Sequence, residues 1–409
     1  MIRARRNPWQ NLFWELSGKR NYLGENAKLF GYDPKRCHLF AFGRNAIYAA
    51  CRIVNLTKED EVLVPAWICD EALQPFRIIG CKLSFYLTVP TTFEVDLDSI
   101  KDQITHRTKL IHIVNHFGHS QPWEEIQQNL RIFDIPILED NAYSLFSSYQ
   151  GKMLGSFGNF SVFSLRKSLS LIDGGMLCIN DSSKATGLKR FQSSRWYYPP
   201  EQYQALSLVE SFIRTKIGVR LPLIKVLGKK TRPLPPPKSK PPLYSDPMKS
   251  IPFWPRGLCS PEFAYHCERP ISRLSRLMLR SFTEARLRQI IARKRQFYKF
   301  LIDLLKNLKG ITLINPCLKD GEVPYSVSML IKKNRDYVLR RLEENYPVMA
   351  WPTLPAEVVD QLEDYPDVCQ LGRQLFQFNL QNPIIDHPDI EQRLRGFVKD
   401  LKKALAMVV

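Results

Sequence analysis

Residues 160–179 read Phe-Ser-Val-Phe-Ser-Leu-Arg-Lys-Ser-Leu-Ser-Leu-Ile-Asp-Gly-Gly-Met-Leu-Cys-Ile. The apolar runs at 160–163 and 175–179 predict two buried strands. The loop between them carries Lys167 and ends in Gly174-Gly175. A lysine that leaves a buried strand can lose its hydration, which lowers its pKa and makes its amine a Schiff-base nucleophile. Ser164, one turn earlier, is placed to offer its hydroxyl to a phosphate.

On both sides of this stretch, between about residues 40 and 180, short apolar runs alternate with amphipathic segments. This alternation predicts an α/β architecture, with a mostly parallel sheet and helices on its faces. In such sheets ligands bind outside the carboxyl ends of the strands. The predicted strands are 62–65, 82–86, 110–114, 135–138, 160–163 and 175–179, and the predicted helices are 45–54, 70–79 and 123–133.

The rest of the chain predicts a second domain. Residues 190–256 are aromatic, Pro-rich and basic, and the Pro-rich core at 232–242 is incompatible with a helix or a central strand. We therefore expect residues 1–255 to form a large domain with an exposed basic insertion near 227–242, and residues 256–409 to form a smaller α+β domain. In the smaller domain we expect helices at 270–308, 336–345 and 388–407, and strands at 311–314, 326–331, 348–351 and 376–380.

The overall composition is that of a globular protein with a strong positive charge. The 409 residues include 59 Lys and Arg against 40 Asp and Glu, a formal net charge of +19. Nucleic acid, an anionic membrane surface, or an anionic substrate and cofactor would each suit this charge, but no zipper, zinc-finger or RNP-like pattern favours nucleic acid. We expect no transmembrane segment, because no apolar run approaches about 18 residues. The nine scattered cysteines lack a C-x-x-C pair, so we expect reduced thiols, no metal site and a cytoplasmic location.

Three further groups of polar residues lie at predicted strand ends or helix starts. Gly43-Arg44-Asn45 opens a helix, whose exposed amides can bind an anion. Asp140 ends a strand, where a carboxylate serves either as a helix cap or to keep a heterocyclic nitrogen protonated. Asn115 follows another strand and is a neutral donor suited to a phenolate oxygen. These residues and Lys167 are therefore expected to meet at one edge of the sheet.

The order of these features resembles the DegT/StrS-type sugar aminotransferases, which use pyridoxal phosphate. Lys167 follows Asp140 by 27 residues, and Gly174 follows Lys167 by 7, as in that family. The resemblance covers about residues 38–180 closely and the part from about 269 to the end more loosely. It implies the aspartate-aminotransferase-like fold, which is fold type I of the pyridoxal-phosphate enzymes.

The resemblance also implies roles for individual residues. Lys167 resembles the lysine of the internal aldimine, and Asp140 the acid that pairs with the pyridine nitrogen. Ser164 and the amides of Arg44 and Asn45 look like phosphate ligands, beside Gly43. Asn115 occupies the position near the phenolate oxygen.

The chain departs from the family at several substrate-side positions. Arg44 stands where the family commonly has Thr, and Tyr143 where it has Gln or His. Asn115 replaces the usual His. The ring-stacking aromatic after Val-Pro is displaced, because Trp67 lies two residues after Pro65 and Cys69 takes the other candidate position. The Asn-x-Arg-Met segment that relatives lend to a neighbour is absent.

The function that the resemblance implies is transfer of an amino group from an amino-acid donor such as glutamate to an anionic, nucleotide-linked keto-sugar. Two alternatives remain, a transaminase acting on a non-sugar carbonyl compound and a catalytically silent pyridoxal-phosphate-binding regulatory protein. Retention of both Lys167 and Asp140 argues against the silent protein. By analogy with the fold, we expect a homodimer in which Arg273 or Arg276 reaches the neighbouring active site.

Overall fold

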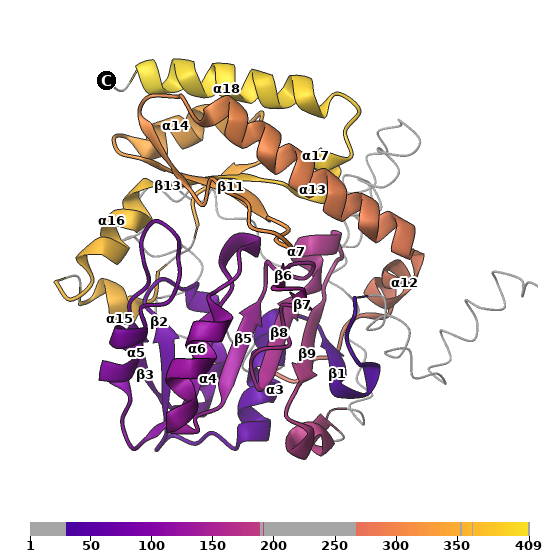
Figure 1. Ribbon diagram of the computed structural model, residues 1–409, viewed down its shortest axis with the longest axis vertical. Helices are drawn as coiled ribbons and strands as arrows, with labels where there is room; N and C mark the ends of the chain where they lie inside the picture. The colour runs from indigo at the N-terminus through magenta and orange to yellow at the C-terminus, as the bar shows by residue number, and fades with distance from the viewer. Residues whose placement is uncertain (1–29, 189–190, 192–266, 352–353, 362, 408–409) are drawn as a thin grey trace, which may run out of the picture.

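The computed structural model describes residues 30–188, 191, 267–351, 354–361 and 363–407. These residues form a large α/β domain and a smaller C-terminal domain that packs on it (Figure 1). The expected insertion near 227–242 and the expected boundary at residue 255 lie outside the described residues.

The large domain is built on a seven-stranded sheet with the order β1-β9-β8-β5-β4-β2-β3. Strands β3, β2, β4, β5 and β8 run parallel, and β9 is antiparallel to both β8 and β1. The expected mostly parallel sheet is therefore confirmed. Its strands are β1 (Cys37–Phe40), β2 (Glu61–Pro65), β3 (Lys82–Tyr86), β4 (Thr108–Val114), β5 (Ile137–Asn141), β8 (Phe160–Ser164) and β9 (Gly175–Ile179).

Helices cover both faces of this sheet because successive strand residues point to opposite sides. Val62 and Val64 of β2 pack into the cluster that contains residues of α3 and α4. Leu63, between them, packs into the cluster formed with α5 and α6. The helices are α3 (Gly43–Val54), α4 (Asp70–Ile79), α5 (Leu97–Gln103) and α6 (Trp123–Leu130), and a short hairpin of β6 (Ser148–Tyr149) and β7 (Lys152–Met153) precedes β8.

Gly175, the second of the two glycines that end the loop after Lys167, lies against the backbone before α3. A Cβ atom on Gly175 would lie 2.2 Å from the carbonyl oxygen of Phe42, so a larger residue would displace backbone. Phe42 is the residue before α3, and its amide donates to Asn45 Oδ1 at 3.1 Å. Strand β9 therefore packs directly against the turn that starts α3, and this contact fixes the start of α3 beside the end of β8.

The smaller domain contains a four-stranded antiparallel sheet with the order β10-β11-β13-β12. This sheet lies between the large domain and helices α13 and α18 (Figure 1). Its strands are β10 (Ile311–Ile314), β11 (Ser326–Ile331), β12 (Val348–Met349) and β13 (Leu375–Asn379), and its helices are α12 (Arg273–Ser281), α13 (Glu284–Leu305), α14 (Arg335–Leu342), α15 (Ala356–Val359), α16 (Pro366–Gln374), α17 (Asn382–Ile385) and α18 (Ile390–Ala406).

The single helix expected at 270–308 is wrong, because the chain forms two helices there. α12 ends before Phe282, which has an extended conformation, and α13 starts after Thr283. The Thr283 side chain accepts a hydrogen bond from the amide of Arg286 at 3.2 Å. This N-cap satisfies an amide that a continuous helix would have paired internally.

A polar contact joins the two domains near the end of β4. The carboxylate of Glu322 accepts hydrogen bonds from the Ser120 amide at 2.8 Å and lies 3.0 Å from Nδ1 of His119. Burial alone would raise the pKa of Glu322, but the bonds to His119 and to backbone amides outweigh it and lower the pKa. Gly118 has φ +95°, and a Cβ there would lie 2.3 Å from the Val323 carbonyl oxygen. The small domain is thereby fixed over the carboxyl end of β4.

Two sequence expectations can be compared with the described residues. None of the described helices is long and apolar enough to cross a membrane. The described cysteines are unpaired thiols. Cys37 and Cys178 nevertheless face each other on the paired strands β1 and β9, with their sulfur atoms 2.7 Å apart.

Candidate active site

A cavity of about 260 Å³ lies at the carboxyl end of β5 and β8. Most of the residues predicted from sequence line it, namely Gly43, Arg44, Asp140, Ser164 and Lys167. They come from α3, β5, β8 and the short helix α7 (Leu165–Leu169). This is the edge of the sheet at which parallel α/β folds bind ligands.

Lys167 lies in α7, and not in the open loop expected from the sequence. Its Nζ lies 3.9 Å from the ring centroid of Tyr143 and 5.8 Å from that of Trp351. Burial lowers the pKa of Lys167 and outweighs the opposing effects of Cys69 and Asp140, while Arg166 lowers it further. A lowered pKa increases the fraction of neutral amine, which is the nucleophilic form.

Asp140 faces the cavity from the end of β5. Its Oδ2 lies 3.1 Å from Nε2 of His112, and its Oδ1 accepts a hydrogen bond from the Ala142 amide at 2.8 Å. Burial alone would raise the pKa of Asp140, but the hydrogen bond and the charge of His112 lower it, as does Lys167. Asp140 therefore stays a carboxylate, which can hold a proton on a heterocyclic nitrogen.

The start of α3 contributes Gly43 and Arg44 to the cavity. Nη1 of Arg44 lies 3.2 Å from Oε2 of Glu71, which also lines the cavity. Asn45 is buried beneath, where its Nδ2 donates to the Cys267 carbonyl at 2.8 Å and its amide donates to the Phe42 carbonyl at 3.1 Å. The structure thus brings Gly43 and Arg44 to the site and uses Asn45 to stabilise the first turn.

Four of the predicted cofactor ligands do not line the cavity: Asn45, Trp67, Asn115 and Tyr143. The side chain of Asn115 is fully buried and bonded within the protein: its Nδ2 donates to Glu139 and Asn141, and its Oδ1 accepts from the Gln121 amide and Trp123. Trp67 is also fully buried and stacks on Phe93, with ring centroids 5.8 Å apart.

Cys69, the other candidate position for the stacking residue, does line the cavity. Tyr143 contacts Lys167 without belonging to the lining. The geometry therefore gives Asn115 and Trp67 a structural role beneath the site, and it leaves Cys69 and Tyr143 beside the reactive lysine.

The structure places at the site several residues that the sequence patterns did not indicate. His112 holds Asp140 from β4, and its signal was a polar residue inside the apolar run 110–114. Arg166 lines the cavity next to Lys167, and Glu71 comes from the first turn of α4. Nothing in the spacing of Glu71 and Arg44 indicated that they would meet.

The polar groups of this cavity fit pyridoxal phosphate. An amine with a lowered pKa suits its carbonyl carbon, and a buried carboxylate suits its ring nitrogen. The Ser164 hydroxyl and the helix start at Gly43 suit its phosphate. The fit is poorer at the face of the ring, because Cys69 stands at a position where an aromatic side chain was expected.

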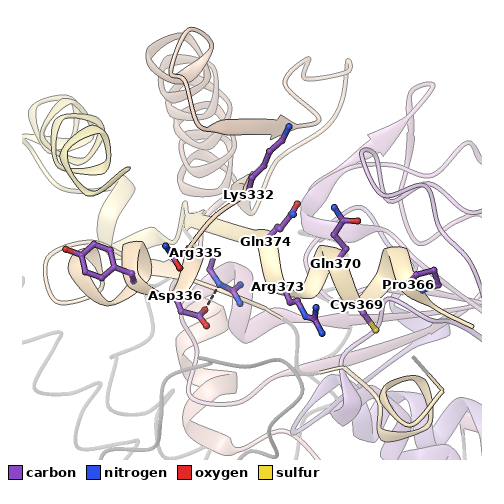
Figure 2. Close-up of a pocket in the computed structure, with 10 residues that line it drawn as sticks. Lys332, Arg335, Asp336, Pro366, Cys369, Gln370, Arg373 and Gln374 are labelled. Carbon is purple, nitrogen blue, oxygen red and sulfur yellow. Dashed lines mark hydrogen bonds and ion pairs between the residues drawn. The ribbon is translucent and has the colours of Figure 1, made fainter. Parts of the chain in front are cut away.

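Two larger cavities lack such a set of groups. One, of about 650 Å³, lies on the small domain between α14 and α16. Figure 2 shows Arg335 beside Asp336, to which it is joined by an ion pair with a distance of 2.6 Å. Arg335 also donates to the carbonyl oxygens of Leu375 and Gly372, so each of its three side-chain nitrogens already donates a hydrogen bond within the protein. The second of these larger cavities, of about 1130 Å³, includes Thr108 and Pro136 at the amino ends of β4 and β5. Lys167 lies at the opposite end of the sheet, after the carboxyl end of β8.

The sheet order, the lysine after β8 and the carboxylate at the end of β5 are those of the fold shared by the type I pyridoxal-phosphate enzymes. A solved structure supports this fold. The Escherichia coli GDP-4-keto-6-deoxy-D-mannose-3-dehydratase with bound hydrated PLP superposes with a TM-score of 0.62 at 17% sequence identity, covering 99% of this chain and 98% of that chain. The expected fold class is confirmed.

Residues 34–204 match the DegT/DnrJ/EryC1/StrS aminotransferase family. GDP-perosamine synthase of Escherichia coli O157:H7 is 29% identical over 172 residues, which cover 41% of this chain and 47% of that protein. UDP-2-acetamido-2-deoxy-3-oxo-D-glucuronate aminotransferase of Pseudomonas aeruginosa is 27% identical over 159 residues, covering 38% and 44%. The chain thus spans about half the length of these curated relatives.

Proposed function

We propose that this protein is a pyridoxal-phosphate-dependent aminotransferase that moves an amino group from an amino-acid donor, glutamate, to a nucleotide-linked keto-sugar. The observation that carries the proposal is the pairing of Lys167 and Asp140 in one cavity. The pKa of each is lowered, so the lysine tends toward the neutral amine and the aspartate toward the carboxylate. These are the protonation states that the chemistry requires. The two curated relatives, a perosamine synthase and a sugar aminotransferase, support the sugar as acceptor.

The residues of the cavity have separate roles in the proposed reaction. When bound, pyridoxal phosphate supplies an aldehyde and an electron-withdrawing ring. Lys167 would hold the cofactor through its amine, and the same neutral amine would serve as the base for the donor's α-proton. Asp140, oriented by His112, would keep a proton on the ring nitrogen. Tyr143 and Trp351 shield the lysine amine from water, which preserves its lowered pKa.

The identity of residue 167 favours transamination over dehydration. A histidine at this position would suggest a dehydratase, the activity named for the structure compared above. A lysine can both bind the cofactor covalently and shuttle a proton. We therefore place this chain with the aminotransferases of the family.

We also propose a homodimer located in the cytoplasm. The motivation for the dimer is the analogy with the fold and the arginine-rich start of the second domain. Arg276 lies near His38 of the same chain. Burial is the main cause that lowers the pKa of His38 to about 4, and the charge of Arg276 lowers it further. A monodisperse monomer with full turnover would contradict the dimer.

Spectroscopy and peptide mapping test the proposed function. Purified protein supplied with pyridoxal phosphate should show the visible absorbance of a lysine-bound cofactor, and L-glutamate should convert it to the pyridoxamine form. Borohydride reduction followed by peptide mapping should place the pyridoxyl label on Lys167. A label on the exposed Lys152 or on another lysine, or no label, would overturn the proposal. Turnover with a keto-acid but with none of a panel of nucleotide-linked keto-sugars would favour the non-sugar alternative.

A further inference from the structure

Two arginines lie next to one aromatic ring at the cavity. The guanidinium carbons of Arg44 and Arg166 each lie 5.3 Å from the ring centroid of Phe42. All three residues line the cavity that contains Lys167. Arg166 is exposed and forms no ion pair with a carboxylate of the described residues. A guanidinium without an acidic partner, next to a reactive lysine, is available to an anionic ligand.

Arg44 faces a carboxylate that water can reach. Its Nη1 lies 3.2 Å from Oε2 of Glu71, whose side chain is 64% exposed, whereas that of Arg44 is 19% exposed. An exposed ion pair contributes only about 0–1 kcal/mol. Glu71 is therefore held weakly, and a carboxylate from solution can take its place on Arg44.

We propose that Arg44 and Arg166 form a subsite for a carboxylate of the amino donor, and that Glu71 occupies Arg44 until the donor displaces it. This subsite rests on the proposed function, because it would bind the amino donor of that reaction. The bound Glu71 side chain indicates a carboxylate, because Arg44 already pairs with that group in the structure. The planar fork of a guanidinium matches a carboxylate with two parallel hydrogen bonds.

The phosphate of the cofactor has a separate set of ligands in this arrangement. Ser164 and Gly43 line the same cavity and supply a hydroxyl and the backbone of a helix start. The guanidinium groups of Arg44 and Arg166 extend to Phe42, which is only partly buried. The proposed subsite thus uses the two guanidinium groups and leaves the Ser164 hydroxyl and the Gly43 backbone to the phosphate.

Glu71 makes the proposal testable in two directions. Removing an arginine removes attraction for the ligand, so binding should weaken. Removing the charge of Glu71 removes a competitor, so binding should tighten by up to about fivefold, the equivalent of 1 kcal/mol. A purely structural ion pair would give no gain from the loss of Glu71.

The experiment uses the cofactor-loaded full chain and succinate, an unreactive dicarboxylate, with affinity measured by calorimetry. Glu71→Gln should bind succinate about threefold to fivefold more tightly than the wild type. Arg44→Gln and Arg166→Gln should each bind it at least about tenfold more weakly. Glu71→Gln combined with Arg44→Gln should bind no more tightly than Arg44→Gln alone. Glu59→Gln, an exposed glutamate on the loop before β2, is the matched control and should bind as the wild type does.

A second readout links the subsite to the amino donor. In a single-turnover reaction with L-glutamate, Glu71→Gln should lower the L-glutamate concentration that gives half of the limiting rate. Unchanged succinate binding in all three variants, with cofactor content and circular dichroism intact, would overturn the subsite. Inorganic phosphate displacing succinate at equal concentration would overturn the assignment to a carboxylate. A protein that binds succinate as described but shows no lysine-bound cofactor would instead refute the proposed function.

Discussion

Lys294 is a buried cation whose removal should stabilise the protein. It lies in the apolar face of α13 beside Ile290 and Phe297, and it is 2% exposed. The only charged or aromatic contact of its Nζ among the described residues is with the ring of Tyr325, at 5.8 Å from the centroid. The neighbouring Arg293 and Arg295 pair with Asp386 and Asp320, whereas Lys294 has no carboxylate partner in this part of the chain.

The magnitude follows from the pKa. Burial lowers the pKa of Lys294 from 10.5 to about 8, which corresponds to about 3 kcal/mol of destabilisation when the side chain is charged in both states. The folded-state pKa lies below the unfolded value, so this cost is absent above pH 10.5. The destabilisation by the charged lysine grows as the pH falls from 10.5 to about 8, and it is constant at lower pH. Lys294→Met, which keeps the length of the side chain, should therefore raise the free energy of unfolding by about 3 kcal/mol at pH 6.5 and by about 1 kcal/mol at pH 9.5.

Urea denaturation at the two pH values measures both numbers. Lys299→Met, at an exposed position of the same helix, is the control and should show no such difference between pH values. An equal gain for Lys294→Met at pH 6.5 and 9.5 would refute the electrostatic argument. A loss of stability of Lys294→Met at pH 6.5 would show that the charged ammonium group of Lys294 is stabilised by an interaction in solution.

The remaining predictions concern the site and its support. Asp140→Ala should bind pyridoxal phosphate but lose nearly all turnover, because the ring nitrogen would no longer keep its proton; near-normal transamination would reduce this residue to a cap. Lys167→Ala should fold and lose turnover by several orders of magnitude, as measured by single-turnover kinetics; retention of a borohydride-stable label would contradict its role. Gly175→Ala should destabilise the protein by more than about 1 kcal/mol in urea titrations and reduce cofactor content, because its Cβ would meet the Phe42 carbonyl; wild-type values for both would show that the turn before α3 adapts freely.

The order of elements could be predicted from sequence because it depends on local patterns. Several strands, such as 82–86, 311–314 and 326–331, begin and end where the apolar runs indicated. Helices with clear amphipathic periodicity, such as 70–79, were predicted with the correct bounds. The expected helix at 270–308 was wrong because a single N-cap at Thr283 outweighed a continuous helical pattern.

The sequence by itself determined the class of fold and the two residues on which the proposed chemistry rests, Lys167 and Asp140, because their spacing and their places at strand ends are properties of the chain. The tertiary structure alone decided which side chains meet them. His112 lies beside Asp140 because β4 and β5 pair in parallel, and Glu71 lies beside Arg44 because α3 and α4 share one face of the sheet. It also buried Asn115 away from the cavity. The direction of a side chain depends on register and packing between distant segments, and no local pattern encodes either.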